Sequence, residues 1–251
     1  MTLINKNKDF IIIIQARFNS SRLKGKILKK IGNYEVLKIM IKRLERSNIL
    51  RNKIIINISK VNSSRIVSFC KKNHIKYFVG PDKNVLKRYN DCAKKFNVKN
   101  IIRIPSDCPL IDPKIILKGL KIYQSNKLDY VTNLCPPSYV DGNDVEIISY
   151  KILKKINLSA SKAFDKEHVT TYLRKKLKLF RYKNFKANKD LSRTYRLTLD
   201  YKEDFILIKK IVLKLGIYAS YNQIVSFLKK NKKTSSINKK HIGKMWYQKK
   251  F

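Results

Sequence analysis

The chain alternates short apolar runs, rich in β-branched residues, with longer segments in which apolar residues recur at helical spacing. Such runs are typical of buried strands in a parallel sheet, and the segments between them of amphipathic helices. The predicted strands are residues 10–14, 53–58, 77–79, 100–105 and 129–133. The predicted helices are residues 36–44, a segment capped by Ser63, residues 85–96, residues 203–215 and residues 222–230. This alternation predicts a three-layer α/β fold around a mostly parallel, doubly wound sheet.

A polar loop follows the first apolar run, Ile11 to Ile14, without any spacer. It supplies three cations together with hydroxyls, amides and a glycine, which are Gln15, Arg17, Asn19, Ser20, Ser21, Arg22, Gly25 and Lys26. Open α/β sheets bind ligands at the carboxyl ends of their strands, and these groups suit phosphate. We therefore predict a triphosphate-binding loop. The alternative is a solvated basic loop, but this loop uses two arginines where the rest of the chain mostly uses lysine.

The loop is not a Walker A motif. That motif requires a glycine, four residues, and then Gly-Lys-Ser or Gly-Lys-Thr. Here Gly25 and Lys26 are followed by Ile27, and no glycine precedes Gly25 in the chain.

Asp107, which follows Ser106 at the end of the strand at residues 100–105, is a candidate metal ligand. Asp200 precedes the helix predicted from Glu203, and a metal-binding role for it is implied only by the family resemblance described below. A carboxylate at the carboxyl edge of a sheet is well placed to hold Mg²⁺. The alternatives are a turn residue for Asp107 and a helix N-cap for Asp200. Asp112, which is followed by Pro113, is interpreted as a structural N-cap.

A third acidic group lies between residues 134 and 146, where Pro136, Pro137 and Gly142 interrupt the chain. Three acids crowd together there, although the whole chain has only 17; they are Asp141, Asp144 and Glu146. A role for them in binding a sugar is what the family resemblance described below implies. The alternative is a hairpin built on Asp141-Gly142.

The composition is strongly basic, with 251 residues, a formal charge of +41 and 43% hydrophobic residues. A length of this size accommodates one large α/β domain. The charge invites a nucleic-acid-binding interpretation, but the lysines are spread along the whole chain, whereas a binding patch would be clustered. We therefore attribute the charge to background composition and expect no specific nucleic-acid partner. The charge should still attract anions such as nucleotides.

The four cysteines, Cys70, Cys92, Cys108 and Cys135, form no C-x-x-C pair, and the three histidines stand apart. This spacing argues against a zinc site and favours free thiols in a reducing cytoplasm. No apolar run approaches the roughly 20 residues of a membrane-spanning helix, and the first nine residues are polar. We therefore expect a cytoplasmic protein without a membrane segment.

The phosphate loop resembles the signature of the cytidylyltransferases that make CMP-activated sugars. The matching residues are Gln15, Ala16, Arg17, Ser20, Ser21, Arg22, Leu23, Gly25 and Lys26. The likeness is closest to the spore-coat polysaccharide biosynthesis protein F type, and more distant to the 3-deoxy-manno-octulosonate and acylneuraminate cytidylyltransferases. Lys24 stands where the pattern usually has proline, and Asn19 where it often has glycine.

Further segments resemble motifs of the same family in the same order. They are residues 80–89, residues 107–111, residues 139–146, residues 167–170 and residues 195–205. In residues 80–89, which border the nucleotide pocket in the family, Asn84 replaces the usual acid; an ordinary turn and N-cap is the alternative there. Ser106, Tyr201 and Lys202 also depart from the pattern. His168 is either a substrate ligand or a packing residue.

The resemblance implies one nucleotide-diphospho-sugar-transferase-like (Rossmann-like) domain over residues 1–251. Residues 134–195 would form a small insertion for sugar binding and homodimer contact. The implied reaction transfers CMP from CTP to an acidic, nonulosonate-like sugar, with release of pyrophosphate and with Mg²⁺ as cofactor, for surface polysaccharide or glycan biosynthesis.

The resemblance also assigns roles to individual residues. Catalysis falls to Arg17, Lys26 and Asp107, and the metal to Asp107 and Asp200. Nucleotide binding falls to Gln15, Ala16, Arg17, Ser21, Arg22, Gly25 and Lys26. Sugar binding falls to Asp141, Asp144, Glu146 and His168.

Three alternatives remain open from the sequence. The chain could use another nucleoside triphosphate, could be a binding protein that has lost catalysis, or could bind nucleic acid. The intact Arg17, Lys26 and Asp107 argue against lost catalysis. Neither the acceptor sugar nor the general base is identified by any motif.

Overall fold

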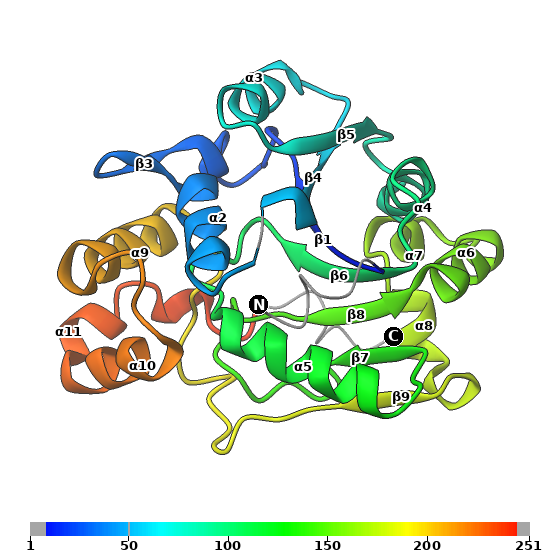
Figure 1. The fold of residues 1–251 in the computed structure, drawn as a ribbon. Helices are drawn as coiled ribbons and strands as arrows, with labels where there is room; N and C mark the ends of the chain where they lie inside the picture. The colour runs from blue at the N-terminus through cyan, green and yellow to red at the C-terminus, as the bar shows by residue number, and fades with distance from the viewer. Residues whose placement is uncertain (1–8, 50, 245–251) are drawn as a thin grey trace.

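The computed structural model describes residues 9–49 and 51–244, and a seven-stranded sheet forms its centre (Figure 1). The strands are β1 (Phe10–Ala16), β4 (Ile54–Ser59), β5 (Lys76–Gly80), β6 (Asn100–Pro105), β7 (Tyr130–Thr132), β8 (Glu146–Ser149) and β9 (Tyr182–Asn184). Their order is β5-β4-β1-β6-β8-β7-β9. Only β8 runs against the others, because it pairs antiparallel with both β6 and β7. The predicted mostly parallel sheet is confirmed.

Helices cover both faces of this sheet. One face carries α2 (Val36–Arg46), α3 (Ser64–Lys72) and α5 (Pro113–Ser125); the other carries α4 (Val85–Lys95), α6 (Tyr150–Ser159) and the short α8 (Thr171–Lys175), with α7 (Ala163–Glu167) beside α4 and α8. The isoleucines of β1 divide between the two cores. Ile12 and Ile14 belong to the first and Ile13 to the second. Because successive strand residues point to opposite faces, the uninterrupted isoleucine run serves both layers, and the predicted three-layer architecture is confirmed.

A third core joins α2 to the C-terminal helices α9 (Lys202–Leu215) and α10 (Tyr221–Lys230). Figure 1 shows α9, α10 and the short α11 (Lys232–Ser235) grouped on one side of the sheet, away from α4 and α6. The remaining elements are the hairpin of β2 (Lys30–Ile31) and β3 (Tyr34–Glu35) and the 3₁₀ turns η1 (Lys26–Leu28), η2 (Arg51–Lys53), η3 (Leu177–Leu179) and η4 (Lys239–His241).

Several local predictions change in the structure. Ser63 occupies the N-cap position of α3, but its side chain makes no capping hydrogen bond. The N-cap of α9 is Tyr201, so the interpretation of Asp200 as that cap is wrong. Asp141 and Gly142 do not form a hairpin turn. Asp141 instead forms an isolated parallel β-bridge, through backbone hydrogen bonding, with Arg196. Asp112 does cap α5, since it accepts a hydrogen bond of 2.9 Å from the backbone N–H of Lys114.

Residues 134–195 contribute two strands to the main sheet, which the sequence did not indicate. Strand β8 inserts between β6 and β7, and β9 forms the edge beside β7. The carboxyl end of β6 and the acidic segment before β8 are therefore neighbours.

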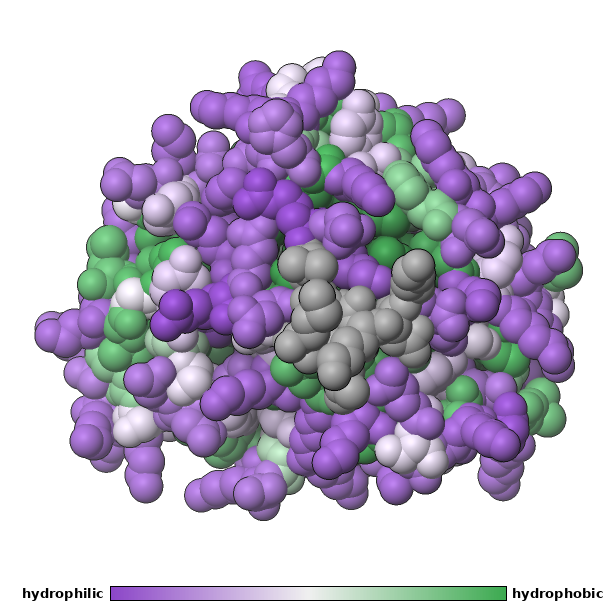
Figure 2. Space-filling model, viewed as in Figure 1, coloured by the Kyte–Doolittle hydropathy of each residue, from purple (hydrophilic) through white to green (hydrophobic). Residues whose placement is uncertain are grey.

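The surface agrees with the spread of lysines along the sequence. Figure 2 shows hydrophilic residues over most of the visible face, interrupted by separate hydrophobic groups. Among the described residues, no helix has both the length and the apolar content that crossing a bilayer requires.

Candidate active site

A cavity of about 910 Å³ opens at the carboxyl ends of β1 and β6. Most residues that the sequence singles out for binding or catalysis line it, namely Gln15, Arg17, Arg22, Lys26, Asp107, Asp141, Asp144, His168 and Asp200. Residues from the other segment that resembles a nucleotide-pocket motif also line it, namely Asp82, Lys83, Asn84, Val85 and Arg88. Segments far apart in the sequence thus meet in one cavity, as expected at the carboxyl edge of an open α/β sheet.

The loop after β1 turns sharply at Gly25 and delivers Lys26 to the cavity. Gly25 has φ +66°, a conformation that favours glycine, and a Cβ there would lie 3.1 Å from the Phe18 ring. Its N–H donates a 3.0 Å hydrogen bond to the Phe18 carbonyl. Two other residues of this loop were predicted to bind nucleotide, of which Ala16 is buried and Ser21 is exposed. These two residues and Gly25 do not line the cavity. Gly25 therefore shapes the loop, while Arg17, Arg22 and Lys26 reach the cavity.

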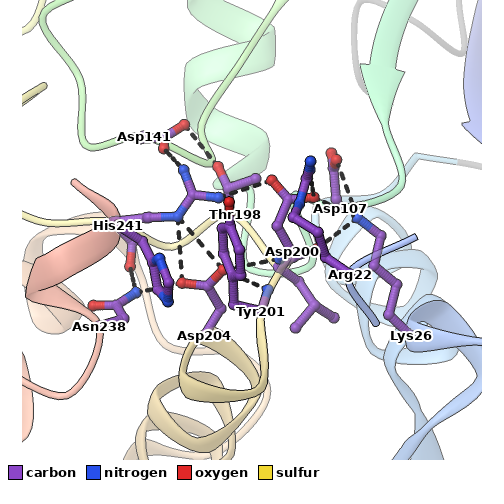
Figure 3. Close-up of polar contacts among 12 residues, drawn as sticks. Arg22, Lys26, Asp107, Asp141, Thr198, Asp200, Tyr201, Asp204, Asn238 and His241 are labelled. Carbon is purple, nitrogen blue, oxygen red and sulfur yellow. Dashed lines mark hydrogen bonds and ion pairs between the residues drawn. The ribbon is translucent and has the colours of Figure 1, made fainter. Parts of the chain in front are cut away.

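Lys26 joins the two predicted metal ligands (Figure 3). Its buried Nζ donates to Oδ1 of Asp200 at 2.8 Å and to the Leu199 carbonyl at 2.7 Å, and it lies 3.4 Å from Oδ2 of Asp107. Arg22 adds an ion pair with Asp200 at 2.9 Å. Burial alone would raise the pKa of Asp200, but the charges and hydrogen bonds of Lys26 and Arg22 outweigh it and hold that pKa below its ordinary range.

The donor set around Lys26 suits Mg²⁺. Mg²⁺ in phosphate-transfer sites is usually held by one or two carboxylates together with substrate phosphates and water. Asp107 and Asp200 are two carboxylates that meet at one ammonium group in the cavity wall. Oδ1 of Asp107 contacts only the Cys108 thiol, at 3.8 Å, among the hydrogen bonds of the described residues. No group of three or more His, Cys, Asp or Glu side chains in the described ranges could hold a metal without such a substrate.

Arg196 is a central residue of the site that the sequence analysis missed. It is 2% exposed and contacts three carboxylates, Asp141 at 2.6 Å, Asp200 at 2.8 Å and Asp204 at 3.3 Å. Burial would lower the pKa of this guanidinium, but the three carboxylates reverse that effect, so it stays charged. The sequence signal that could have identified it is an arginine four residues before Asp200, in a stretch of otherwise uncharged residues.

The acidic segment before β8 lies against residues 196–198. Asp141 accepts hydrogen bonds of 2.6 Å from both Arg196 and Thr198. Gly142 has φ +102°, and a Cβ there would lie 2.6 Å from the carbonyl carbon of Leu197, so only glycine allows this approach. Burial raises the pKa of Asp141 to about 6, even though Arg196 and Thr198 oppose that effect.

Asp144 differs from Asp141 because its carboxylate has no hydrogen-bond or ion-pair partner among the described residues. Asp144 is 7% exposed and lines the cavity. Burial, and then the negative charges of Asp141, Asp107 and Glu146, raise its pKa well above the ordinary value, with Arg103 opposing them. A buried carboxyl group that faces a cavity with a raised pKa has the properties of a general base.

Glu146 does not line the cavity, in contrast to the role in direct sugar contact that the resemblance implied. It is 1% exposed and forms an ion pair with Arg103 and a hydrogen bond with Tyr130. Arg103, which does line the cavity, reaches on to Oε1 of Gln15 at 3.3 Å. Glu146 could therefore affect a ligand through Arg103, which it faces across the β6–β8 pair, or through its charge near Asp144, rather than by direct contact.

One part of the cavity wall comes from α7 and the residue after it. Phe164, Lys166, Glu167 and His168 line this wall. The rings of Phe164 and His168 are 4.3 Å apart. His168 thus packs on an aromatic ring and also lines the cavity, so its position is compatible with both roles that the sequence left open.

Comparisons with known proteins show the family of this chain. A family model described as "Cytidylyltransferase" matches residues 11–245. The spore coat polysaccharide biosynthesis protein SpsF of Bacillus subtilis is 29% identical over 233 residues, 89% of this chain and 95% of its own. An uncharacterized protein of Methanocaldococcus jannaschii is 32% identical over 228 residues, 90% of this chain and 93% of its own.

The distant relationship is confirmed as well. The 3-deoxy-manno-octulosonate cytidylyltransferase of Rickettsia canadensis is 27% identical over 151 residues, 57% of this chain and 58% of its own. Among solved structures, a cytidylyltransferase from Leptospira borgpetersenii has a TM-score of 0.86 and 29% identity, and the match covers 91% of this chain and 97% of that one.

Proposed function

The chain belongs to the cytidylyltransferase family, and we propose that it transfers CMP from CTP to an acidic sugar with release of pyrophosphate. The observation that carries the proposal is the meeting of Lys26 with Asp107 and Asp200 in the cavity wall, beside Arg17 and Arg22. This arrangement combines triphosphate-binding cations with carboxylates suited to a divalent metal. The sequence similarity to a spore coat polysaccharide protein and to an octulosonate cytidylyltransferase supports a sugar acid as the acceptor, and polysaccharide or glycan synthesis as the setting.

In the proposed reaction, a sugar hydroxyl oxygen forms a bond to the α-phosphorus of CTP. The bond from that phosphorus to the bridging α–β oxygen breaks, and pyrophosphate leaves with the electron pair. Arg17, Arg22 and Lys26 bind the triphosphate and offset the negative charge that gathers on its oxygens in the transition state. Mg²⁺, when held by Asp107 and Asp200, would supply further charge neutralisation.

The hydroxyl proton needs an acceptor, and we assign this role to Asp144. Its carboxylate lines the cavity and has no hydrogen-bonding partner in the described part of the chain, and burial raises its pKa well above the ordinary value, which favours proton uptake. Asp141 and His168 also line the cavity and would bind other sugar hydroxyls.

The test is a screen for pyrophosphate release with CTP, UTP, GTP and ATP against a panel of acidic and neutral sugars, with Mg²⁺ or Mn²⁺ present. We expect turnover with CTP and a 2-keto sugar acid, and a CMP-sugar identified by mass spectrometry. Turnover with another nucleotide alone would reassign the donor. Equal turnover in excess EDTA would contradict the metal requirement.

A further inference from the structure

The segment after α10 returns to the active site, although the sequence assigned this basic tail no function. It runs through α11 and η4, and two of its polar side chains are almost fully buried, Asn238 at 1% exposed and His241 at 5%. Lys244, at the end of the described segment, lines the cavity. Burying polar side chains is costly unless they are hydrogen-bonded, so their partners indicate what the segment does.

Asn238 contacts the group that holds Asp200 in place. Its Nδ2 donates to the Arg196 carbonyl at 3.0 Å and to Oδ1 of Asp204 at 2.7 Å. Oδ2 of the same Asp204 accepts 2.9 Å hydrogen bonds from the backbone N–H groups of Asp200 and Tyr201. Asn238 therefore completes a set of bonds that fixes the turn at residues 200–201 (Figure 3).

His241 contacts the other side of that turn. Its ring stacks on Tyr201, with centroids 3.7 Å apart and planes at 2°, and its Nε2 lies 3.2 Å from Oε2 of Glu203. The guanidinium of Arg22 lies over the same Tyr201 ring, 5.1 Å from its centroid, and Nζ of Lys244 lies 5.9 Å from it. Tyr201 thus links the C-terminal segment to a cation of the phosphate loop.

We infer that three residues of the C-terminal segment, Asn238, His241 and Lys244, form part of the nucleoside-triphosphate site. Asn238 and His241 are positioning residues that hold Asp200 and Tyr201 against Arg22 and Lys26, and Lys244 adds a cation that contacts the triphosphate. The inference rests on the proposed function insofar as it needs a triphosphate ligand. It does not depend on which base or sugar is used.

Measuring triphosphate binding in the absence of metal distinguishes a role in the binding site from a purely structural role in packing. We would measure the Kd of CTP, UTP, GTP, ATP and inorganic pyrophosphate by titration calorimetry in EDTA, beside the thermal midpoint, for the full-length chain. Asn238→Ala should raise the Kd of the preferred nucleotide about tenfold, the scale of one or two lost hydrogen bonds. His241→Ala should weaken binding, and His241→Phe should restore most of it, because phenylalanine keeps the stacking on Tyr201. Lys244→Ala should weaken binding several-fold, the scale of one exposed charge contact.

Two matched controls complete the experiment. Tyr123→Phe removes a partly buried hydrogen bond of 2.9 Å to Asn100, near the amino end of β6, and should lower the midpoint without changing Kd. Lys239→Ala removes an exposed lysine of the same C-terminal segment and should change neither.

Two results would overturn the inference. In the first, Asn238→Ala lowers the midpoint but leaves the Kd at the wild-type value, as the Tyr123→Phe control does. In the second, His241→Phe binds the nucleotide no better than His241→Ala. A wild-type chain that binds a triphosphate other than CTP would overturn the CTP assignment while still testing the inference with that nucleotide. A wild-type chain that binds none of the five ligands would overturn both.

Discussion

Nζ of Lys26 lies 2.8 Å from Oδ1 of Asp200, although 174 positions separate the two residues in the chain. The ammonium lies between two carboxylates, since Asp107 approaches it as well. Lys26 therefore has two functions in the proposed reaction: it offers charge to the triphosphate, and it suppresses repulsion between the two acids that would hold the metal.

Replacing Lys26 with methionine should remove both functions at a similar side-chain length. We expect kcat/KM for CTP to fall on the order of 100-fold or more, the scale of a lost electrostatic element in a transition state. The thermal midpoint should fall too, because Asp107 and Asp200 lose the cation they share. Lys24→Met, at an exposed lysine two residues earlier, is the control. Equal losses in both variants would mean that Lys26 contributes only to the general positive charge.

Asp107→Asn should damage turnover far more than folding. An amide keeps the shape of the carboxylate but brings no full charge to a metal ion. The expected loss in kcat is on the order of 100-fold, with a thermal midpoint near that of the wild type. The measurement is kcat beside the midpoint for both proteins. A stable variant with nearly normal kcat would show that the metal is held elsewhere, and an unfolded one that Asp107 is a structural turn residue.

Asp144→Asn should increase stability at neutral pH while reducing turnover. The folded-state pKa of Asp144 is raised by burial, so ionisation of this group disfavours the native state at pH values above its ordinary pKa of about 4. An amide cannot ionise, and the variant should therefore gain in midpoint relative to wild type as pH rises from 4 to 8. Turnover should fall because the proposed proton acceptor is gone, while the Kd of CTP should stay close to normal. If the difference in midpoint between Asp144→Asn and wild type did not change with pH, the folded-state pKa of Asp144 would not be raised and the prediction would be wrong.

Asp200 should make the opposite contribution to the pH dependence of stability. Its folded-state pKa lies below the ordinary value because Lys26 and Arg22 outweigh the effect of burial. Its stabilising effect is thus present above the unfolded-state pKa of about 4 and is lost as pH falls through the lower folded-state pKa. Asp200→Asn should lower the free energy of unfolding at pH 7 and should reduce its decline between pH 4 and pH 2. Urea unfolding across this range measures both, and an unchanged acid limb would count against the Lys26–Asp200 pair.

Glu146→Gln should affect stability and CTP binding more than sugar use. The change leaves the buried guanidinium of Arg103 without its full counter-charge, and breaking a buried ion pair costs about 3–5 kcal/mol. Since Arg103 contacts Gln15, the Kd of CTP should rise as well. Asp129→Asn, in a pair with the 68% exposed side chain of Arg181, is the control and should change the free energy of unfolding little. A Glu146→Gln variant of normal stability with only a raised KM for the sugar would restore the direct role in sugar binding.

Much of the fold could be predicted because each element carries its own burial pattern. The isoleucines of β1 and the helical spacing in α2 and α4 specify which side of each element is covered, whatever lies on top of it. The presence of Arg17, Arg22 and Lys26 at the cavity was predictable for a similar reason, because polar and basic residues clustered within twelve positions after a strand are a local pattern. Motifs in a fixed order along the chain then identified the family.

The partnerships inside the site could not be predicted in this way, because they join residues that local patterns treat separately. Strand β8 runs antiparallel between β6 and β7, and this buries Glu146 against Arg103. In the sequence alone, Arg196 is an ordinary basic residue and Asn238 is an amide in the basic C-terminal segment. Only the packing of the fold brings both side chains to Asp204. Sequence alone thus determined most strands of the main sheet, though not β8 and β9, and which residue types line its carboxyl edge. The tertiary structure decided which charges neutralise one another, because ion pairing depends on distances that exist only once the layers have packed.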